Sequence, residues 1–286
     1  MKAQEGFPFK RVAIVGPGLM GGSLALALKK LPDPPHIRAL SRDPEEIRLG
    51  VRAGALDEGA TDPEGLLWDR DLVAYATPLE ATLLLMEEHR EFLQPRTLVT
   101  DLVSLKIPIL RKAADLDLQD RFVGSHPMVG GTGSGFSAAS GDLYSGARVW
   151  LVPGESGPSS SVESIRAFWS TLGAFPVEIG PEEHDVAMTW VSHLPQLTSN
   201  ALALTLKRGG YLPRDLGSGG RDMTRLAGSG PEMWRDLIGR APESVIEALG
   251  DLEMALGELR TLLRQRDVEG VVARMEETRD WMGGDS

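Results

Sequence analysis

The sequence of 286 residues contains no cysteine, and this excludes disulfide bonds, thiolate catalysis and cysteine-ligated metal sites. It also has no uninterrupted apolar run near the roughly 18 residues that a membrane-spanning helix needs. The first apolar segment, residues 12–15, is short and leads directly into glycines, which argues against a secretory signal. We therefore expect a cytoplasmic protein with no membrane partner and no bound metal.

Positive charge is in short supply. The chain has 30 lysine and arginine residues against 41 aspartate and glutamate residues, which gives a formal net charge of -11. Because neutralising nucleic-acid phosphates needs clustered cations, this balance argues against a nucleic-acid partner. A small anionic molecule would have to be bound locally, by a few placed cations. The remaining composition, 42% hydrophobic and 25% charged, is that of an ordinary globular protein.

Short β-branched runs alternate with helical stretches in the first part of the chain. A helix is predicted over residues 19–31, and the prolines of residues 32–35 end it. Because parallel strands require crossover connections, the alternation predicts a doubly wound, Rossmann-type parallel sheet of the α/β class. The predicted strands are residues 11–15, 37–40, 72–76, 97–102, 122–125, 149–152 and 177–179.

After Pro181 the strand pattern stops, and long helical patterns cover residues 182–207, 231–238 and 242–266. Since a two-fold interface lets one patch serve both subunits, an apolar stripe on the last of these predicts a homodimer. The length fits two domains, an α/β domain at residues 1–180 and an all-α dimerisation domain at residues 181–286. The stripe consists of Val245, Leu249, Leu252, Leu256, Leu259 and Leu263.

A G-x-G-x-x-G pattern, Gly16-Pro-Gly-Leu-Met-Gly21, lies directly between the first strand and its helix. Here Gly16 allows a tight turn, Gly18 lets the backbone approach a pyrophosphate, and Gly21 permits close packing of helix and strand. The helix N–H groups and the positive end of the helix dipole would hold the phosphates. The alternative is a tight turn that binds nothing. Three further residues are assigned to this dinucleotide site: Leu19, Met20 and Thr77.

The end of the second strand indicates which dinucleotide is bound. NAD sites usually carry an acidic residue there to bind the ribose 2′-hydroxyl, whereas this strand ends in Ser41-Arg42. A hydroxyl and a guanidinium can receive a 2′-phosphate, so NADP is favoured over NAD. Asp43 leaves the choice open, because a small shift of the strand end would bring its carboxylate to the ribose.

Two polar segments follow later strands of the predicted sheet. They are Asp101-Leu-Val-Ser104-Leu-Lys106 and Ser125-His126-Pro-Met. Because ligands of open α/β sheets bind at the carboxyl ends of the strands, Ser104 and His126 could meet in one cleft. The helical part adds further polar segments: His184-Asp185, Ser192-His193-Leu-Pro195, Asp222-Met-Thr-Arg225 and Met233-Trp234-Arg235-Asp236.

On these segments the chain resembles the prephenate/arogenate dehydrogenase family, from Gly16 to Trp234. The combined pattern G-x-G-x-x-G-G-S, D-x-x-S-x-K, S-H-P-M, H-D, S-H-L-P, D-x-T-R and M-W-R-D is highly specific. The resemblance implies oxidative decarboxylation of prephenate, or arogenate, to 4-hydroxyphenylpyruvate, or tyrosine. The hydride would pass to NAD(P), and the reaction would belong to tyrosine biosynthesis.

The resemblance also implies roles for single residues. His126 would be the catalytic base at the substrate's C4 hydroxyl, and Ser104 would hydrogen-bond to it and to the substrate. Arg225 would bind a substrate carboxylate, and His193 matches an active-site histidine on the long helix. Two further residues would lie around the site and the subunit interface: Asp222 and Trp234.

The chemistry needs these groups. Removing hydride from C4 while a base takes the hydroxyl proton makes a ring ketone, and loss of the ring carboxylate as CO2 then aromatises the ring. A neutral imidazole, with an ordinary pKa of about 6.5, suits the base. A guanidinium offers a carboxylate two parallel donors that an ammonium cannot match. The cofactor supplies the hydride chemistry, and the protein supplies positioning.

The sequence departs from the family pattern in three places. Many relatives have a second histidine three residues after that of S-H-L-P, where this chain has Gln196, which carries no charge. Some have a charged pair in the glycine run where Thr132 and Gly133 stand, so no gating ion pair is expected there. We assign Gln196 and Thr132 to the substrate site. The sequence ends at Ser286, and no C-terminal regulatory domain is expected.

Other interpretations stay open at this point. A β-hydroxyacid dehydrogenase also joins a Rossmann domain to a helical one, but its G-x-x-x-K-x-x-N segment does not occur here. A non-catalytic, NADP-sensing scaffold would not need Ser104, His126 and Arg225 together. His126 or His184 could be structural histidines, and Arg225 could be a surface cation. The glycine-rich residues 130–135 form either a flap beside the substrate or a phosphate loop.

Overall fold

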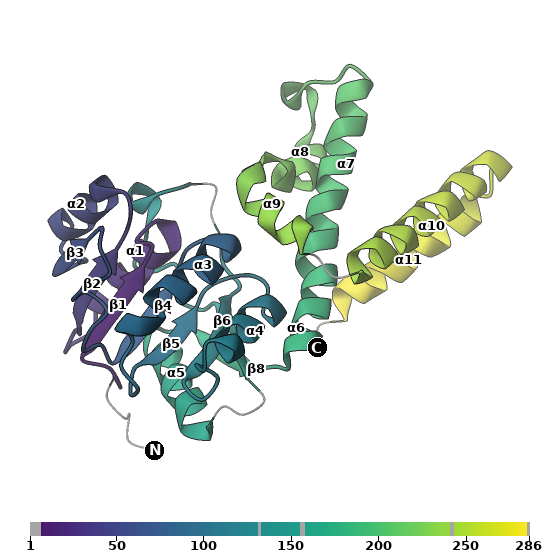
Figure 1. Cartoon of the computed structure of the whole chain (residues 1–286). Helices are drawn as coiled ribbons and strands as arrows, with labels where there is room; N and C mark the ends of the chain where they lie inside the picture. The colour runs from purple at the N-terminus through teal and green to yellow at the C-terminus, as the bar shows by residue number, and fades with distance from the viewer. Residues whose placement is uncertain (1–6, 131–132, 155–157, 241–242, 285–286) are drawn as a thin grey trace. The chain divides into compact units, whose positions relative to one another are not determined.

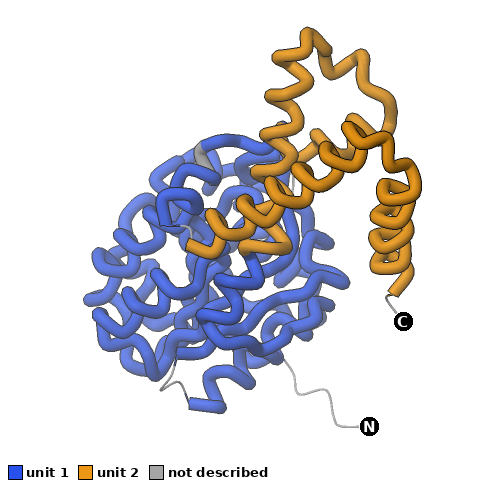
Figure 2. The backbone as a smooth tube through the Cα atoms, turned by 90° about the vertical axis from the view of Figure 1, so that its right-hand side faces the viewer, with its two compact units in different colours: residues 1–188, 228–240 blue, residues 189–227, 241–286 orange. Residues whose placement is uncertain are grey.

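The computed structural model describes residues 7–130, 133–154, 158–240 and 243–284. Contacts between Cα atoms divide the chain into two compact units (Figure 2). Unit 1 comprises Met1–Met188 and Gly228–Arg240, and unit 2 comprises Thr189–Ala227 and Ala241–Ser286. The units interleave along the chain, so no single position in the sequence separates them.

Unit 1 is built on an eight-stranded sheet with the strand order β3-β2-β1-β4-β5-β6-β7-β8. All neighbouring strands are parallel except β6 and β7. The order reverses between β1 and β4, and open sheets bind their ligands at such a reversal, outside the carboxyl ends of the strands. The strands are β1 (Arg11–Val15), β2 (His36–Leu40), β3 (Glu58–Ala60), β4 (Leu72–Tyr75), β5 (Leu98–Asp101), β6 (Phe122–Pro127), β7 (Arg148–Pro153) and β8 (Phe175–Glu178).

The doubly wound sheet predicted from the sequence is confirmed, but two of its features are not predicted. Strand β3 lies at the sheet edge and has three residues with a glycine in the middle, so it gives no β-branched signal. The pairing of β6 with β7 is antiparallel. The described residues between them include a 3-10 turn at Phe136–Ala138 but no crossover α-helix, and antiparallel neighbours need none.

Helices cover both faces of the sheet (Figure 1). Val12 and Ile14 of β1 belong to the hydrophobic cluster that includes α1 and α5, and Ala13 and Val15 belong to the cluster that includes α3 and α4. Burial on both faces explains why this strand is a continuous apolar run. The helices of unit 1 are α1 (Leu19–Lys29), α2 (Pro44–Arg52), α3 (Leu79–His89), α4 (Ile107–Asp115), α5 (Ser159–Thr171), α6 (Pro181–Met188) and α9 (Pro231–Gly239).

Helix α9 packs on α3, although it lies in the helical half of the sequence. Leu237 is buried in the cluster that also holds Leu79 and Leu83 of α3. The guanidinium of Arg240 pairs with both carboxylate oxygens of Glu80, with Nη2 3.0 Å from Oε2. Helix α9 therefore belongs to unit 1, although residues 189–227 of unit 2 separate it from the rest of unit 1 in the sequence.

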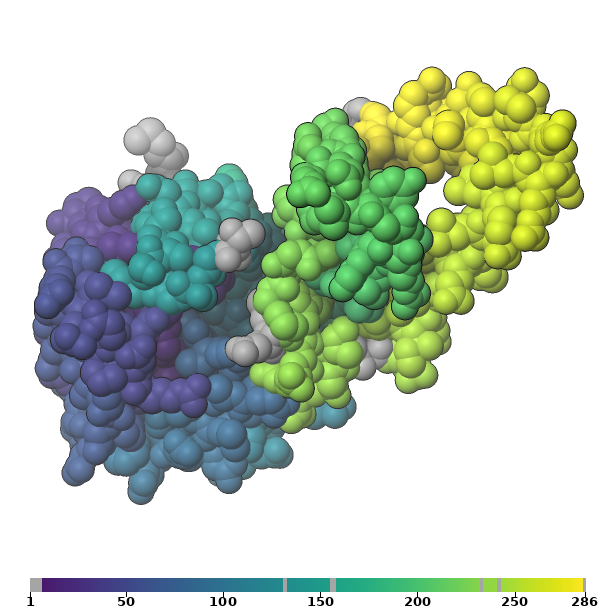
Figure 3. All heavy atoms as spheres, turned by 90° about the horizontal axis from the view of Figure 1, so that it is seen from above, coloured from purple at the N-terminus to yellow at the C-terminus, as the bar shows by residue number. Residues whose placement is uncertain are grey.

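Unit 2 is helical, as the sequence predicts. Its helices α10 and α11 form a hairpin that projects from the rest of the unit (Figures 1 and 3). The turn of the hairpin has Arg266 in the left-handed conformation, with φ 58°, and Asp267 caps α11 by accepting the N–H of Gly270. The elements are a π-helical turn (Thr189–His193), α7 (Leu194–Arg208), α8 (Ser218–Thr224), α10 (Ser244–Gln265) and α11 (Val268–Gly283).

The single helix predicted over residues 182–207 is in fact interrupted. Helix α6 ends at Met188, a π-helical turn covers Thr189–His193, and α7 begins at Leu194. Pro195 has no N–H for the regular helical ladder, and this accounts for the interruption just before it. None of the described helices is long and apolar enough to cross a membrane.

Candidate active site

The loop between β1 and α1 makes a tight turn at its first glycine. Gly16 has φ +88°, in the left-handed region, and a Cβ there would lie 2.5 Å from Thr77 Cγ2. A Cβ on Gly21 would lie 2.2 Å from the carbonyl oxygen of Gly16 and 2.9 Å from Ile14 Cγ2. The third glycine thus lets α1 pack directly on the strand that precedes it.

The start of α1 fits the pyrophosphate of a dinucleotide. Gly18 is the N-cap, and the nearest atom to a Cβ placed there is Glu46 Oε2 at 3.7 Å, which leaves the backbone approachable. Within the described chain no side chain caps this helix, and its first turn holds no acidic residue. Burial raises the pKa of Glu46, and the hydrogen bond from the N–H of Phe136 opposes this. The helix N–H groups can hold phosphate oxygens.

The other residues assigned to the dinucleotide lie around the same turn. Leu19 and Met20 form the first turn of α1, and the carbonyl oxygen of Met20 accepts the hydroxyl of Tyr144 at 2.7 Å. Thr77 follows β4, and its Oγ1 lies 2.8 Å from Thr82 Oγ1 at the start of α3. The sheet therefore brings Gly16 and Thr77 together from neighbouring strands.

The end of β2 is ordered by a short hydrogen-bonded turn. Ser41 Oγ accepts the N–H of Asp43 at 3.1 Å, and Asp43 Oδ1 accepts the N–H of Glu45 at 2.9 Å as the N-cap of α2. Arg42 lies between them and is exposed. The carboxylate of Asp43 thus already stabilises the start of a helix.

A fully buried ion pair joins the ends of β5 and β6. Lys106 Nζ donates to the carboxylate of Asp101 and, at 2.8 Å, to the carbonyl oxygen of Ser125. Asp101 also accepts the N–H of Val103 at 2.9 Å. Burial lowers the pKa of Lys106, and the charge of Asp101 opposes this. The pair fixes the loop that carries Ser104 against the strand that carries His126.

His126, at the end of β6, contacts a second histidine. Its Nδ1 lies 2.9 Å from Nε2 of His184, which is fully buried in α6, and Nδ1 of His184 lies 2.7 Å from Asp185 Oδ1. Ser104 is half-buried in the loop after β5, and its predicted hydrogen bond to His126 stays a prediction. The sequence signal for His184 is the adjacent His-Asp pair, but only the fold brings residues so far apart in the chain together.

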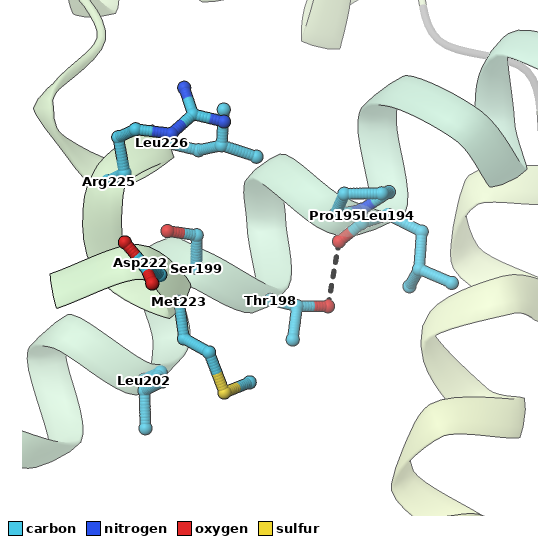
Figure 4. A pocket seen from close by; sticks show the side chains of 9 residues that line it. All are labelled: Leu194, Pro195, Thr198, Ser199, Leu202, Asp222, Met223, Arg225 and Leu226. Atoms are coloured by element: carbon cyan, nitrogen blue, oxygen red, sulfur yellow. Dashed lines mark hydrogen bonds between the residues drawn. The ribbon is translucent and has the colours of Figure 1, made fainter. Parts of the chain in front are cut away.

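Arg225 and Asp222 line an open pocket of about 340 Å³ within unit 2 (Figure 4). Apolar side chains form most of the pocket wall, and Thr198 and Ser199 each add a hydroxyl. Arg225 is exposed and takes part in none of the ion pairs recorded among the described residues, so it does not brace Asp222. The other lining residues are Leu194, Pro195, Thr198, Ser199, Leu202, Met223 and Leu226.

Two further predicted site residues, His193 and Gln196, belong to unit 2, and both are buried. His193 is the last residue of the π-helical turn and is 3% exposed. Gln196 is 4% exposed, and its Nε2 donates to the carbonyl oxygen of Leu226 at 2.8 Å and to Asn200 Oδ1 at 2.7 Å. The amide of Gln196 therefore braces the residue that follows Arg225.

The last two predicted site residues are Trp234 and Thr132. Trp234 lies in α9 and packs against the hydrophobic cluster of α3 and α4, within unit 1. Thr132 lies outside the described residues.

Comparison with known proteins gives the same family for both parts of the chain. The family model described as "Prephenate dehydrogenase, nucleotide-binding domain" matches residues 24–177, and the one described as "Prephenate dehydrogenase, dimerization domain" matches residues 180–277. The prephenate dehydrogenase of Bacillus subtilis is 30% identical over 279 residues, which are 96% of this chain and 75% of that protein.

Solved structures agree. Prephenate dehydrogenase from Aquifex aeolicus, in complex with hydroxyphenyl propionate and NAD+, has a TM-score of 0.88 and 30% identity, over 96% of this chain and 98% of that one. Arogenate dehydrogenase from Synechocystis has a TM-score of 0.81 and 27% identity, over 95% and 98% of the two chains. A Rossmann-like sheet with a helical C-terminal part and these matches define a nicotinamide-dependent dehydrogenase. The chain belongs to the prephenate dehydrogenase family.

Proposed function

We propose that this enzyme carries out the oxidative decarboxylation of prephenate, or of arogenate, with NADP as the hydride acceptor. The observation that carries the proposal is the arrangement of unit 1. The glycine loop follows the carboxyl end of β1, and His126 lies at the carboxyl end of β6. Both are therefore on the same side of one sheet, where its parallel strands end. Three strand spacings of ~4.8 Å separate them, so a dinucleotide bound at the loop extends along the edge toward the imidazole.

His126 is the proposed base. Its ring takes the proton of the substrate's C4 hydroxyl while hydride leaves C4, and the product of this step is a ring ketone. The C–C bond to the ring carboxylate then breaks, CO2 departs, and the electron pair completes the aromatic ring as a phenolate. The imidazolium of His126 returns its proton to that oxygen, so the base is restored. The bound nicotinamide supplies the hydride acceptor.

The preference for NADP is proposed from the end of β2. Ser41 and Arg42 offer a hydroxyl and a guanidinium to a 2′-phosphate. The contact of Asp43 with the N–H of Glu45 supports this choice, because that carboxylate is engaged in capping α2.

The substrate contacts are proposed for unit 2. The pocket beside Arg225 is large enough for a small dicarboxylate, and its guanidinium is not committed to an ion pair within the described chain. His193 and Gln196 are proposed as further substrate contacts of unit 2. Ser104 and Thr132 are proposed as substrate contacts as well. Asp222 and Trp234 are proposed to support the substrate site.

A homodimer is also proposed, together with a division of the sequence into two family domains at residues 180 and 181. This division differs from that of the two compact units, because α6 and α9 belong to unit 1. The description of the second matched family model as a dimerization domain supports the dimer, and the two matches end and begin at residues 177 and 180. Exposed apolar residues of the α10 stripe, Leu256, Leu259 and Leu263, support it further.

The experiment that tests the function is an absorbance assay of nicotinamide reduction, with prephenate and arogenate each tried against NAD+ and NADP+. We expect rapid reduction with at least one ring substrate, with release of CO2 in equal amount and with NADP+ preferred. Reduction with simple β-hydroxyacids but with neither ring substrate would refute the proposal.

A further inference from the structure

The ring of His126 is the first member of a buried chain of three side chains. His126 is 8% exposed, His184 is 0% exposed and Asp185 is 2% exposed. The two short contacts, 2.9 Å between the rings and 2.7 Å from the second ring to the carboxylate, lie within unit 1. The first contact joins two ring nitrogens, and the second joins a ring nitrogen and a carboxylate oxygen. Each contact therefore needs one donor and one acceptor.

The acceptor at the far end is Asp185. Its Oδ1 accepts the N–H of Lys106 at 2.8 Å, and its Oδ2 accepts the N–H of Ile107 at 3.0 Å, at the start of α4. With backbone donors on both oxygens, and with the positive end of the α4 dipole beside it, this group acts as a carboxylate acceptor. Nδ1 of His184 must therefore be the donor of the 2.7 Å contact.

The protonation state of His184 determines which ring donates in the contact between the two histidines. Burial lowers the pKa of His184, although its hydrogen bond to Asp185 opposes this, so the ring is neutral near neutral pH. A neutral imidazole with its proton on Nδ1 has a lone pair on Nε2. The 2.9 Å contact then requires a proton on Nδ1 of His126, which leaves the lone pair of that ring on Nε2.

We propose that His184 and Asp185 are positioning residues that set the tautomer of His126 and keep its Nε2 unprotonated, ready to accept the substrate's hydroxyl proton. This proposal rests on the proposed role of His126 as the base. It explains why Nε2 of His126, and not Nδ1, accepts the hydroxyl proton.

The hydrogen bonds to His184 and Asp185 also stabilise the protonated state of His126. When Nε2 gains the proton, Nδ1 keeps its own and continues to donate to His184, so no second proton has to move. The negative charge of Asp185 at the end of the chain stabilises the imidazolium that forms. A purely structural histidine at position 184 would need neither the carboxylate nor this alignment of donors.

The direct test reads the tautomer by nuclear magnetic resonance of the enzyme labelled with 15N-histidine, with no substrate present. In the wild type, Nδ1 of His126 gives a protonated-type signal and Nε2 an unprotonated-type signal. In His184→Phe the ring volume remains but the acceptor is lost, and the signals of His126 shift toward the opposite tautomer. In His184→Gln an amide oxygen can accept again, and the signals return at least partly.

Turnover should follow the tautomer. We expect kcat of His184→Phe to fall at least tenfold while the Kd for the dinucleotide is unchanged, and His184→Gln to recover part of the loss. His89→Gln is the matched control, because His89 is also a buried histidine of unit 1, with its Nδ1 3.2 Å from Tyr75 hydroxyl. It should leave the signals of His126 and kcat unchanged.

Wild-type signals of His126 in folded His184→Phe would overturn the proposal. If that variant does not fold, Asp185→Asn takes its place. Its amide can reverse the donor order, so the His126 signals should shift toward the opposite tautomer, whereas His184→Gln, which retains an acceptor, should keep the wild-type signals. An enzyme with the predicted tautomer but no turnover of either ring substrate would refute the proposed function and leave the positioning role standing.

Discussion

Residues at the end of β2, where the ribose of the dinucleotide is proposed to bind, make hydrogen bonds within the chain that limit what else they can bind. Ser41 and Asp43 are joined by a hydrogen bond in the turn after β2, and Asp43 caps α2. A carboxylate that caps a helix contributes typically ~1 kcal/mol to its stability, so drawing it away to a ribose has a cost. This favours Ser41 and Arg42 as the groups that meet the 2′ position.

Replacing Ser41 by aspartate should shift the cofactor preference from NADP toward NAD by at least tenfold. The new carboxylate accepts the ribose hydroxyls and repels a 2′-phosphate. The measurement is kcat/KM for both cofactors. A wild type that already uses NAD far better than NADP would contradict this account, and Asp43→Asn would then show whether Asp43 is the ribose ligand.

Arg225 separates substrate binding from chemistry. If its guanidinium holds a carboxylate equally in the ground state and the transition state, Arg225→Ala should raise KM and change kcat little. A charge-assisted hydrogen bond contributes roughly 1.5–3 kcal/mol, so KM should rise about tenfold to a hundredfold. Arg225→Lys should recover part of this, because an ammonium lacks the paired donors.

The control for this prediction is Arg208→Ala, which removes an exposed arginine at the end of α7, outside the pocket. It should leave KM and the melting temperature unchanged. A stable Arg225→Ala enzyme with normal KM would remove Arg225 from the substrate site.

At the scale of elements, strong patterns predict well and weak ones do not. Strand β1 and helix α1 follow from a buried apolar run and the glycine pattern. Helix α11 is not among the predicted helices, and none of its side chains is buried. The contact of His126 with His184 is also beyond the sequence, since it depends on where α6 packs against the end of β6.

The packing of α1 on β1 gives a prediction for one glycine. Gly21→Ala would place a Cβ 2.2 Å from the carbonyl oxygen of Gly16, and backbone cannot move aside cheaply. The helix must shift, so we expect the Kd for the dinucleotide to rise at least tenfold and the melting temperature to fall by several degrees.

Gly250→Ala is the matched control for that change. It also adds a methyl group within a helix, but among the described residues nothing outside the neighbouring backbone of that helix lies within 4 Å of the added Cβ. Alanine favours the helix, so this variant should bind the dinucleotide normally and be at least as stable. Normal dinucleotide affinity in Gly21→Ala would show that α1 does not carry the phosphate site.

At the scale of the whole molecule, the exposed side of α10 is the feature that one chain does not explain. Val245 and Ala248, near its start, are buried, whereas Leu256 is 58% exposed and Leu263 is 66% exposed. Contiguous exposed apolar surface of this kind marks an interaction site, and a second copy of the chain is the partner that a dimerization-domain match favours.

We expect a dimer at micromolar concentration in sedimentation velocity. The double change Leu256→Glu and Leu263→Glu should convert it to a monomer, because charges would be buried without partners. Trp68→Glu, which alters an exposed aromatic residue of unit 1, should leave the dimer intact. A monomeric wild type would contradict the proposed assembly.

The central claim is that His126 is the base of a dinucleotide-dependent dehydrogenation, and the kinetics of His126→Asn test it most directly. Loss of a general base typically costs 10²–10⁴-fold in rate, so kcat should fall by about that factor. The Kd for the dinucleotide should stay within about twofold of the wild type, since the phosphate site lies at the start of α1. Near-normal turnover of the folded variant at neutral pH would contradict the account.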